Sequence, residues 1–479
     1  MAKILLILFY LSRTGLKKRD KLYYSQAIAE KKTKGSDNID YLINKNILEV
    51  PLEFEHMARI GNVLNIKEYL LRHHKVLSRP DFKFKGNEYI SAKIIFNTLK
   101  TIVNFHTSYL VGNPVSITGD KQIVNDVNKL YKKGGYNQTD YEIVQDLTKY
   151  GNAFEYVYLD KDGTIRSKII ANEDSYPIYD EKEQYIAFLE HWEDLQNAVK
   201  WDIVYYPGIV QVYKDEQLQE EYPNLSGLPI HYSALDKSEY NFFGDAPLLD
   251  LIPILDQIER LLSRLDDAIY TLSMNPIGVS MGQKIEGAVP KDLIGATLNL
   301  EDGGDFKYSN AKLDEPSVKL LLDTLFQQLY TVAAVPSAVI GQSNIANVSE
   351  VSLKLLFAQA DYKASQTAQT LKEGFSKRFD YFRKLSANKW NDDLFETLDV
   401  SFNVSRPVDT SSQMNELKTQ FDMGAISRET VIDNSPYTKN TALELQRIQA
   451  EESAKTETKP VIVGADLEQE EKEEKEEEN

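Results

Sequence analysis

The most constraining feature of this sequence is a regular run of apolar residues between positions 251 and 272. Their spacing alternates between four and three residues, which is typical of a narrow apolar seam along one face of an α-helix. The segment 247–274 is therefore predicted to form one helix, roughly 40 Å long at 1.5 Å per residue. The seam consists of Leu251, Leu255, Ile258, Leu262, Leu265, Ile269 and Leu272.

A second long helix is predicted to run beside the first. Asn275-Pro276 ends the first helix, and short apolar runs broken by glycines over 275–315 indicate a small β-rich module. Pro316 then opens a helix expected over 316–335. The seam can pack against this second helix of the same chain, against a neighbouring chain, or against both.

The segment 51–246, ahead of these helices, mixes helical and strand patterns and indicates an α+β arrangement, with a sheet inserted between helical segments. The turn 160–163, with the sequence Asp-Lys-Asp-Gly, is expected to join two strands as a hairpin. Helices are predicted at 65–77, 91–111, 123–132 and 140–150, and strands at 153–159, 164–170, 185–192, 199–206 and 209–214.

The C-terminal part begins with an uncharged loop over 336–348, followed by a helix over 349–384 and a strand over 398–404. Residues 406–453 are predicted to form three short helices, at 412–423, 427–434 and 441–452, each with a Ser or Thr near its start. The tail 454–479 is rich in glutamate and is expected to be disordered, because few apolar side chains are present to offset the entropy of ordering.

Residues 1–50 are expected to form an N-terminal extension. The apolar run 4–11 is far shorter than the roughly 20 residues that cross a bilayer. No small-x-small cleavage site follows it, and Lys17, Lys18 and Arg19 come soon after. We therefore expect neither a signal peptide nor a membrane partner.

The chemistry-bearing residues do not predict a catalytic, cofactor or metal site. The chain has no cysteine, which excludes disulfides and thiolate catalysis. Its six histidines form no HExxH pattern, and His73-His74 is expected on a solvated surface. No GxxxxGK[ST] motif is present, and the turn 160–163 lacks the closing glutamate of a calcium loop. We expect a protein that is not an enzyme.

Several stretches occur in the order and context found in the portal proteins of tailed bacteriophages, and residues 66–452 resemble that family. The matching stretches are 69–79, 97–117 with YLVGNP at 109–114, 151–158 (GNAFEYVY), 178–180 (IYD) and 243–248 (FGDAPL). Two departures stand out: the segment 275–315 is short for the family, and Asn347-Val348 replace a glycine.

The resemblance implies a portal-like α+β fold with a helical wing carrying an inserted β-sheet, a two-helix stem, a small α/β clip and a helical crown. The implied parts are the wing (51–246 and 349–405), stem helices 247–274 and 316–335, clip 275–315, tunnel loop 336–348, crown 406–453 and tail 454–479.

The resemblance also implies a homo-oligomeric ring of twelve subunits at the portal vertex of the virion, assembled in the host cytoplasm. Double-stranded DNA would pass through it, without sequence specificity, during packaging and ejection. The implied partners are the terminase large subunit, the major capsid and scaffolding proteins, and the head-tail adaptor. Candidate DNA-facing loop residues are Gln342, Ser343, Asn344, Ile345, Ala346, Asn347 and Val348, and candidate channel-facing acids are Asp256, Glu259, Asp266 and Asp267.

The net charge of -18 agrees with a conduit that does not grip DNA, because tight binding of phosphates requires clustered Lys and Arg. Two alternatives remain open. One is a virion structural protein without a DNA channel, and the other is a carboxylate-dependent enzyme.

Overall fold

The computed structural model describes residues 50–84, 87–180, 184–194, 196–237, 242–273, 277–282, 302–309, 314–336, 350–386, 390, 392–406, 410–435, 437–438, 444–445 and 447–451. The chain divides into two units. The first comprises 1–345 and 356–405, and the second comprises 346–355 and 406–479. The N-terminal extension, most of the expected tunnel loop and the acidic tail lie outside the described residues.

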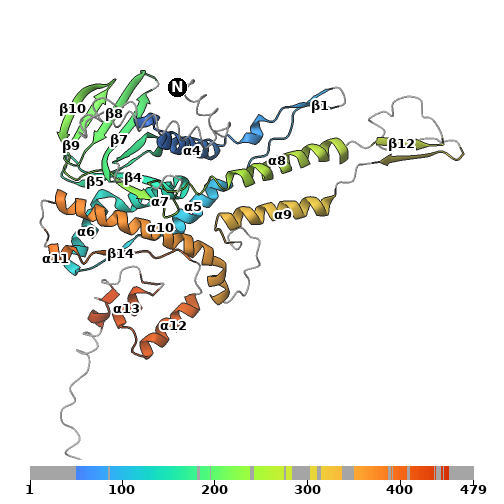
Figure 1. Cartoon of the computed structure of the whole chain (residues 1–479). Coiled ribbons are helices and arrows are strands. Elements are labelled where there is room, and N and C mark those ends of the chain that lie inside the picture. The colour runs from blue at the N-terminus through green and yellow to red at the C-terminus, as the bar shows by residue number, and fades with distance from the viewer. Residues whose placement is uncertain are drawn as a thin grey trace, which may run out of the picture. The chain divides into compact units, whose positions relative to one another are not determined.

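Four helices lie between residues 54 and 150 of the first unit (Figure 1). Asp120 caps one of them by accepting a hydrogen bond from the Gln122 amide, and Gly135 ends it at φ 75°, a conformation that glycine adopts without strain. The helices expected at 123–132 and 140–150 are confirmed. The elements are α4 (Phe54–Leu70), α5 (Thr98–Val111), α6 (Lys121–Gly134) and α7 (Tyr136–Tyr150), with 3-10 turns η1 (Val50–Leu52), η2 (Lys75–Ser78) and η3 (Asn172–Asp174).

Two expected helices have different bounds. The helix expected at 65–77 ends at Leu70, because Arg72 turns to φ 73° and the His73 amide closes back onto the Glu68 carbonyl at 2.8 Å. The helix expected at 91–111 begins only at Thr98. Residues 91–97 are not helical, since several of their amides donate to side chains of another element.

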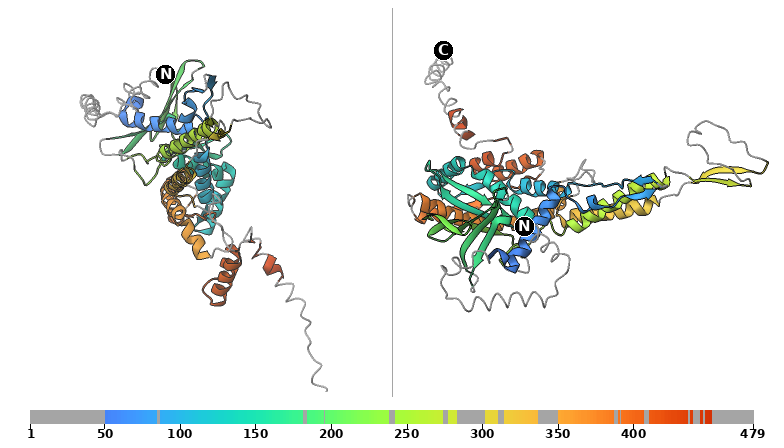
Figure 2. Two further views of the ribbon diagram at one scale, coloured as in Figure 1. Left: turned by 90° about the vertical axis from the view of Figure 1, so that its right-hand side faces the viewer. Right: turned by 90° about the horizontal axis from the view of Figure 1, so that it is seen from above.

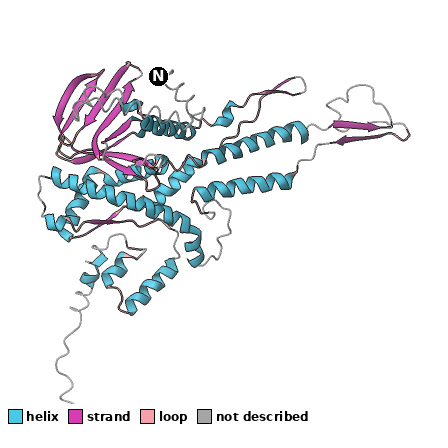
Figure 3. Ribbon diagram, viewed as in Figure 1, coloured by secondary structure: helices cyan, strands magenta, loops and turns pink. Residues whose placement is uncertain are grey.

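Two antiparallel sheets follow (Figure 3). One has the order β10-β9-β8-β7-β6 and the other β11-β4-β5. They share a core in which Phe154 and Phe188 are fully buried with ring centroids 5.5 Å apart. The hairpin at 160–163 is confirmed, whereas β6, β10 and β11 lie outside the expected set. The strands are β4 (Asn152–Leu159), β5 (Ile165–Ile170), β6 (Ser175–Tyr179), β7 (Tyr185–Asp194), β8 (Val199–Tyr205), β9 (Ile209–Lys214), β10 (Gln217–Pro223) and β11 (Ile230–Ser233).

The long helix α10 (Glu350–Leu385) confirms the helix expected at 349–384. Its side chains Leu371, Phe375 and Phe382 are fully buried in a core shared with α6, α7 and the three-stranded sheet. After the short helix α11 (Asp392–Phe395), strand β14 (Asp399–Ser401) pairs with β3 (Ser116–Thr118). The expected strand 398–404 is thus present but shorter.

An arm extends from the first unit (Figure 2). It contains α8 (Ile252–Ala268), the π-helical turn η4 (Ile269–Ser273) and α9 (Glu315–Val332), and α8 contacts α9 side by side. Between them, β12 (Ile277–Met281) pairs antiparallel with β13 (Asp305–Ser309). Pro253 stands in the first turn of α8, so this helix begins five residues after the expected position 247.

The second unit contains α12 (Thr410–Asp422) and α13 (Arg428–Asp433), which contact each other. The Ser427 side chain caps α13 by accepting a hydrogen bond from the Thr430 amide at 3.2 Å. Both helices were expected, and the described residues 447–451 of the third are helical. Within the described residues, no helix is both long and apolar enough to cross a membrane.

Candidate functional site

The candidate site is the arm, which we define as α8, η4, α9 and the segment 79–97 that runs along α8. This segment includes the hairpin of β1 (Phe82–Phe84) and β2 (Asn87–Tyr89). Figures 1 and 2 show α8 between the segment and α9. Three layers of the same chain therefore stack at this place.

The apolar seam of α8 packs inside the chain at its base. Leu255 and Ile258 are fully buried, and Leu262 joins them in a cluster with Leu325 and Leu329 of α9. Of the packing arrangements that the sequence left open, the one within a single chain is found. Burial decreases along the arm: Leu251 is buried, Leu265 is half-buried and Ile269 is exposed, while the Leu272 side chain lies outside the described part.

A polar stripe on the neighbouring face of α8 binds the backbone of the segment. The amide nitrogens of Ala92, Ile94 and Phe96 donate to side-chain oxygens of Asp267, Ser263 and Glu259, at 2.9, 3.0 and 2.8 Å. Two residues of extended chain advance about 6.6 Å, and four residues of helix advance about 6 Å. Every second amide of the segment therefore meets every fourth side chain of α8. We call this set of three hydrogen bonds the ladder.

Charged side chains fix both ends of the ladder. The Nδ1 atom of His74 lies 2.7 Å from Glu259, and Arg79 donates to Asp267 at 2.6 Å. One turn before Glu259, Asp256 accepts hydrogen bonds from the Tyr69 hydroxyl at 2.5 Å and from Lys75 at 2.8 Å.

These contacts correct part of the expectation for channel-facing acids. Glu259 and Asp267 are buried against another segment of the same chain, so their carboxylates do not face an open channel. The Asp256 side chain is mostly covered by its partners as well. Only Asp266 is exposed. A stripe of polar residues at helical spacing beside an apolar seam was the signal that could have indicated a second packing partner for α8.

The outer surface of α9 is almost free of charge. Its exposed residues between 317 and 332 include only two charged side chains, Lys319 and Asp323. At 100° per residue these two lie at one edge of the exposed surface. We call the remainder the neutral face of α9, and it consists of Ser317, Leu320, Leu321, Thr324, Gln327, Gln328, Thr331 and Val332.

The end of α9 is anchored where the expected tunnel loop begins. The amides of Ala334 and Val335 close onto the carbonyls of Thr331 and Tyr330, with Ala334 at φ 53°. His106 donates from Nε2 to the Ala333 carbonyl at 2.7 Å, and burial lowers the pKa of His106 to about 4. The expected DNA-facing residues, Gln342, Ser343, Asn344, Ile345, Ala346, Asn347 and Val348, lie outside the described residues.

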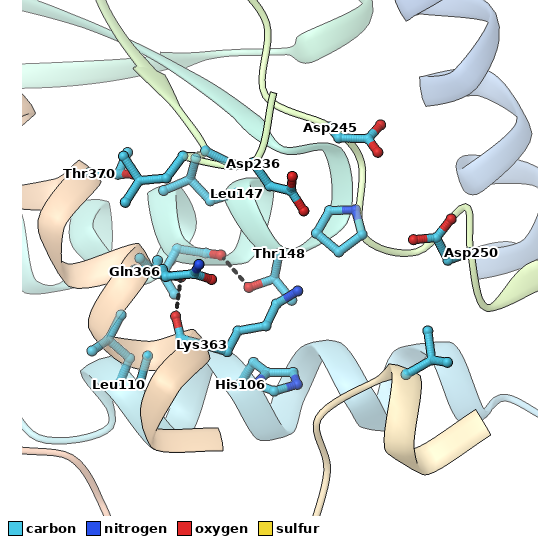
Figure 4. A pocket seen from close by; sticks show the side chains of 17 residues that line it. His106, Leu110, Leu147, Thr148, Asp236, Asp245, Asp250, Lys363, Gln366 and Thr370 are labelled. Carbon is cyan, nitrogen blue, oxygen red and sulfur yellow. Dashed lines mark hydrogen bonds between the residues drawn. The ribbon is translucent and has the colours of Figure 1, made fainter. Parts of the chain in front are cut away.

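A polar cavity of about 180 Å³ lies beside this anchor, between α5, α7 and α10 (Figure 4). Its walls include Asp236, Asp245, Asp250 and Lys363, which come from separate parts of the chain. Burial lowers the pKa of Lys363, and the charges of Asp236 and Asp250 oppose this effect. Nowhere in the described part of the chain do three or more ligating side chains gather as a metal site would require.

The stretches that resemble portal motifs meet in the interior. Asn152, from 151–158, donates to the Gly244 carbonyl at 3.0 Å and accepts from the Gly244 amide at 3.0 Å. Gly151 has φ 71°, and a Cβ there would lie 2.0 Å from the Asp245 carbonyl oxygen. These motif residues therefore hold the base of the arm against β4.

A buried arginine that the sequence did not single out joins α10 to α7 and β4. Arg378 contacts Asp140 of α7 at 2.5 Å and Glu155 of β4 at 2.9 Å, and all three side chains are buried. Its guanidinium also lies 4.2 Å from the centroid of the Phe375 ring. Nothing in the local periodicity marks Arg378, because its partners are more than two hundred residues away.

The two adjacent histidines are in different environments. His73 is exposed beside Glu68, as expected. His74 is buried, so the expectation of a solvated surface is wrong for this residue. His74 is buried because it contacts Glu259 of α8, a partner that local sequence does not reveal.

The sequence comparisons with known proteins identify one family. The sequence profile of the family described as phage portal protein, SPP1 Gp6-like, matches residues 51–458. The portal protein of Bacillus phage SPP1 is 22% identical over 396 residues, which are 74% of this chain and 74% of that protein. The neck of an empty gene transfer agent (GTA) particle, computed with C6 symmetry, gives a TM-score of 0.46 at 10% identity, over 70% of this chain and 87% of that one. The native GTA neck, computed with C12 symmetry, gives 0.44 at 10% identity over the same shares.

Proposed function

Because the chain belongs to the SPP1 Gp6-like family of phage portal proteins, we propose that it forms a homo-oligomeric ring through which double-stranded DNA enters and leaves the capsid. The supporting observation is the outer surface of the arm. Large apolar side chains stay exposed there in a single chain, including Tyr270 at 45% and Ile269 at 39%. Contiguous exposed apolar surface commonly marks an interaction site, and neighbouring arms of a ring would cover part of it.

The neutral face of α9 is the wall that we propose for the channel. Hydroxyl and amide groups of Thr324, Gln327 and Gln328 offer phosphates only weak partners, and the release of counterions that drives tight DNA binding requires Lys or Arg. DNA would then slide without sequence-specific contacts. The proposed wall is uncharged, whereas Glu259 and Asp267, two of the candidate channel-facing acids, are buried.

Ring formation is tested by mass photometry and negative-stain microscopy of the purified chain. A closed ring with a mass many times 54.7 kDa is expected, with twelve subunits as the count that the family resemblance implies. A solitary species of 54.7 kDa at micromolar concentration would contradict the proposal.

The channel wall is tested by adding charge to the neutral face. Thr324→Lys together with Gln328→Lys should leave rings intact but make them retain DNA in a salt-dependent manner and slow packaging. Gln122→Lys is the matched control, since Gln122 is exposed on α6, away from the arm. Unchanged DNA passage in the double variant would remove α9 from the channel while leaving the ring in place.

The remaining partners follow from family membership. We propose that the segment 275–315, which includes β12 and β13, contacts the terminase large subunit and the head-tail adaptor, and that the wing contacts the major capsid and scaffolding proteins. The ring would stand at the portal vertex, after assembly in the host cytoplasm. Deleting residues 283–301 should abolish terminase binding in a pull-down assay and preserve rings, and retained binding would contradict this assignment.

The alternative of a virion protein without a channel makes a different prediction. It allows assembly but no central hole, so an averaged image down the symmetry axis separates the two. No observation in the described residues favours the carboxylate-dependent enzyme, since Glu259 and Asp267 of α8 are occupied by backbone amides and Asp267 also by Arg79.

A further inference from the structure

An aromatic patch covers the outer end of the arm. The rings of Tyr89 and Tyr270 stack with centroids 5.0 Å apart, and those of Phe82 and Tyr89 are 4.8 Å apart. Ile90 beside them is 77% exposed and Tyr270 is 45% exposed. The hairpin and the turn η4 thus place aromatic rings side by side, next to the exposed Ile90. We call Phe82, Phe84, Tyr89, Ile90 and Tyr270 the aromatic patch.

Negative charge borders this patch. Burial raises the pKa of Tyr89, and the nearby charges of Asp267 and Asp266 add to the effect. Asp267 is occupied by Arg79 and the Ala92 amide, whereas Asp266 is exposed. The patch therefore combines aromatic faces with an accessible carboxylate, and this combination suits a guanidinium group.

An arginine stripe lies on another flank of the same helix. Arg260 and Arg264 are exposed one turn apart, next to Gln257. Arg264 and Asp266 are two residues apart, so they point about 160° away from each other and do not form a pair within one chain. The ladder and the seam occupy the faces between them, which leaves the stripe facing neither the segment nor α9.

We propose that the arginine stripe of one subunit docks on the aromatic patch of the next, with Arg264 stacked on the exposed aromatic rings and paired with Asp266. The proposal rests on the proposed ring and names the contact that joins its arms. A second copy of the chain is the partner because the two complementary surfaces lie on opposite sides of one helix. In an open row of subunits, such a contact leaves one surface unpaired at each end. Every surface is paired only when the ring closes.

A charge swap tests this contact. Arg264→Asp alone and Asp266→Arg alone should each lower the fraction of protein in rings about tenfold or more, measured by mass photometry at fixed concentration. The double variant with both substitutions should restore rings to near the wild-type fraction, because the charges then match again between copies. Lys319→Asp, on an exposed edge of α9, is the control that should assemble normally. Circular dichroism establishes that each variant is folded.

Cross-linking provides an independent measurement, since the chain contains no cysteine. Ile90→Cys with Arg260→Cys, which keeps Arg264, should give disulfide-linked multimers on a non-reducing gel. The control pair, Ile90→Cys with Gln122→Cys, should remain monomeric on that gel because Gln122 lies on α6.

The outcomes separate this inference from the proposed function. Rings that tolerate Arg264→Asp and show no cross-link would overturn the contact and leave the ring standing. Wild-type protein that forms no rings would overturn the proposed function itself. Normal rings combined with lost DNA packaging in Arg264→Asp would assign the stripe to another protein, and this too would overturn the contact between copies.

Discussion

The imidazole of His74 and the carboxylate of Glu259 lie 2.7 Å apart in the interior of the first unit. The second ring nitrogen of His74 faces the Tyr69 carbonyl at 3.0 Å, and Glu259 also accepts the Phe96 amide at 2.8 Å. Both ring nitrogens of His74 therefore face an oxygen atom of a neighbouring residue. One buried pair thus joins the chain just after α4, the middle of α8 and the segment that leads into α5.

Removal of one partner should destabilise this joint strongly. His74→Ala leaves Glu259 buried without its histidine partner, and loss of one member of a buried pair costs about 3–5 kcal/mol. The free energy of unfolding, measured by urea titration, should fall by that order. His73→Ala is the matched control, because the His73–Glu68 pair is exposed and should contribute roughly 0–1 kcal/mol. Equal losses in the two variants would contradict the structural role of Glu259.

The ladder should be visible as alternating protection from hydrogen exchange. The amides of Ala92, Ile94 and Phe96 donate to α8 side chains, so they should exchange slowly in an NMR measurement. The amides of Lys93 and Ile95 should exchange faster. Ser263→Ala should speed exchange at Ile94 and cost about 1–3 kcal/mol, because a buried donor loses its acceptor. Uniform protection along 92–96 would show that the segment is held in another way.

His106 should make the stability of the first unit depend on pH. Burial lowers its pKa to about 4, against about 6.5 in an unfolded chain. Between these values the unfolded state binds more protons, so the contribution of His106 is fully present above about pH 6.5 and is lost as the pH falls towards 4. The loss amounts to about 3 kcal/mol at most.

His106→Gln provides the comparison, because its amide can still donate to the Ala333 carbonyl but does not titrate in this range. The difference in the free energy of unfolding between wild type and variant should change with pH below about 6.5 and stay constant above it. A difference that is independent of pH would contradict the stated burial of the imidazole.

The end of α9 should be stabilised by glycine at one position and weakened by glycine at its neighbour. Ala334 has φ 53°, a left-handed conformation that costs an L-residue about 1–2 kcal/mol, so Ala334→Gly should raise the melting temperature. Ala333 has φ -70° and ψ -8°, on the right-handed side of the map, so Ala333→Gly should lower it by the equivalent of about 1 kcal/mol. Stabilisation by both substitutions would show that this helix end has a different conformation.

Local sequence determined the elements of this protein more completely than their contacts. Regular spacing of Leu255, Ile258 and Leu262 was sufficient to predict α8, because burial of one face is what makes a helix of this kind stable. The break at Pro316 and the glycine-rich stretch before it gave the paired helices, and the hairpin at 160–163 followed from its turn residues. These signals extend over one or two turns of chain, and short-range physics is enough to interpret them.

Only the tertiary structure decided what the polar residues do. Asp256, Glu259 and Asp267 were expected to face a channel because the family resemblance implies one. Their carboxylates instead accept hydrogen bonds from residues more than 160 positions earlier in the chain. Arg378 likewise has its partners 238 and 223 positions away. Apolar periodicity records which face of a helix is covered, but a hydrogen bond between distant segments leaves no period in either of them, so its partner emerges only when the chain has folded.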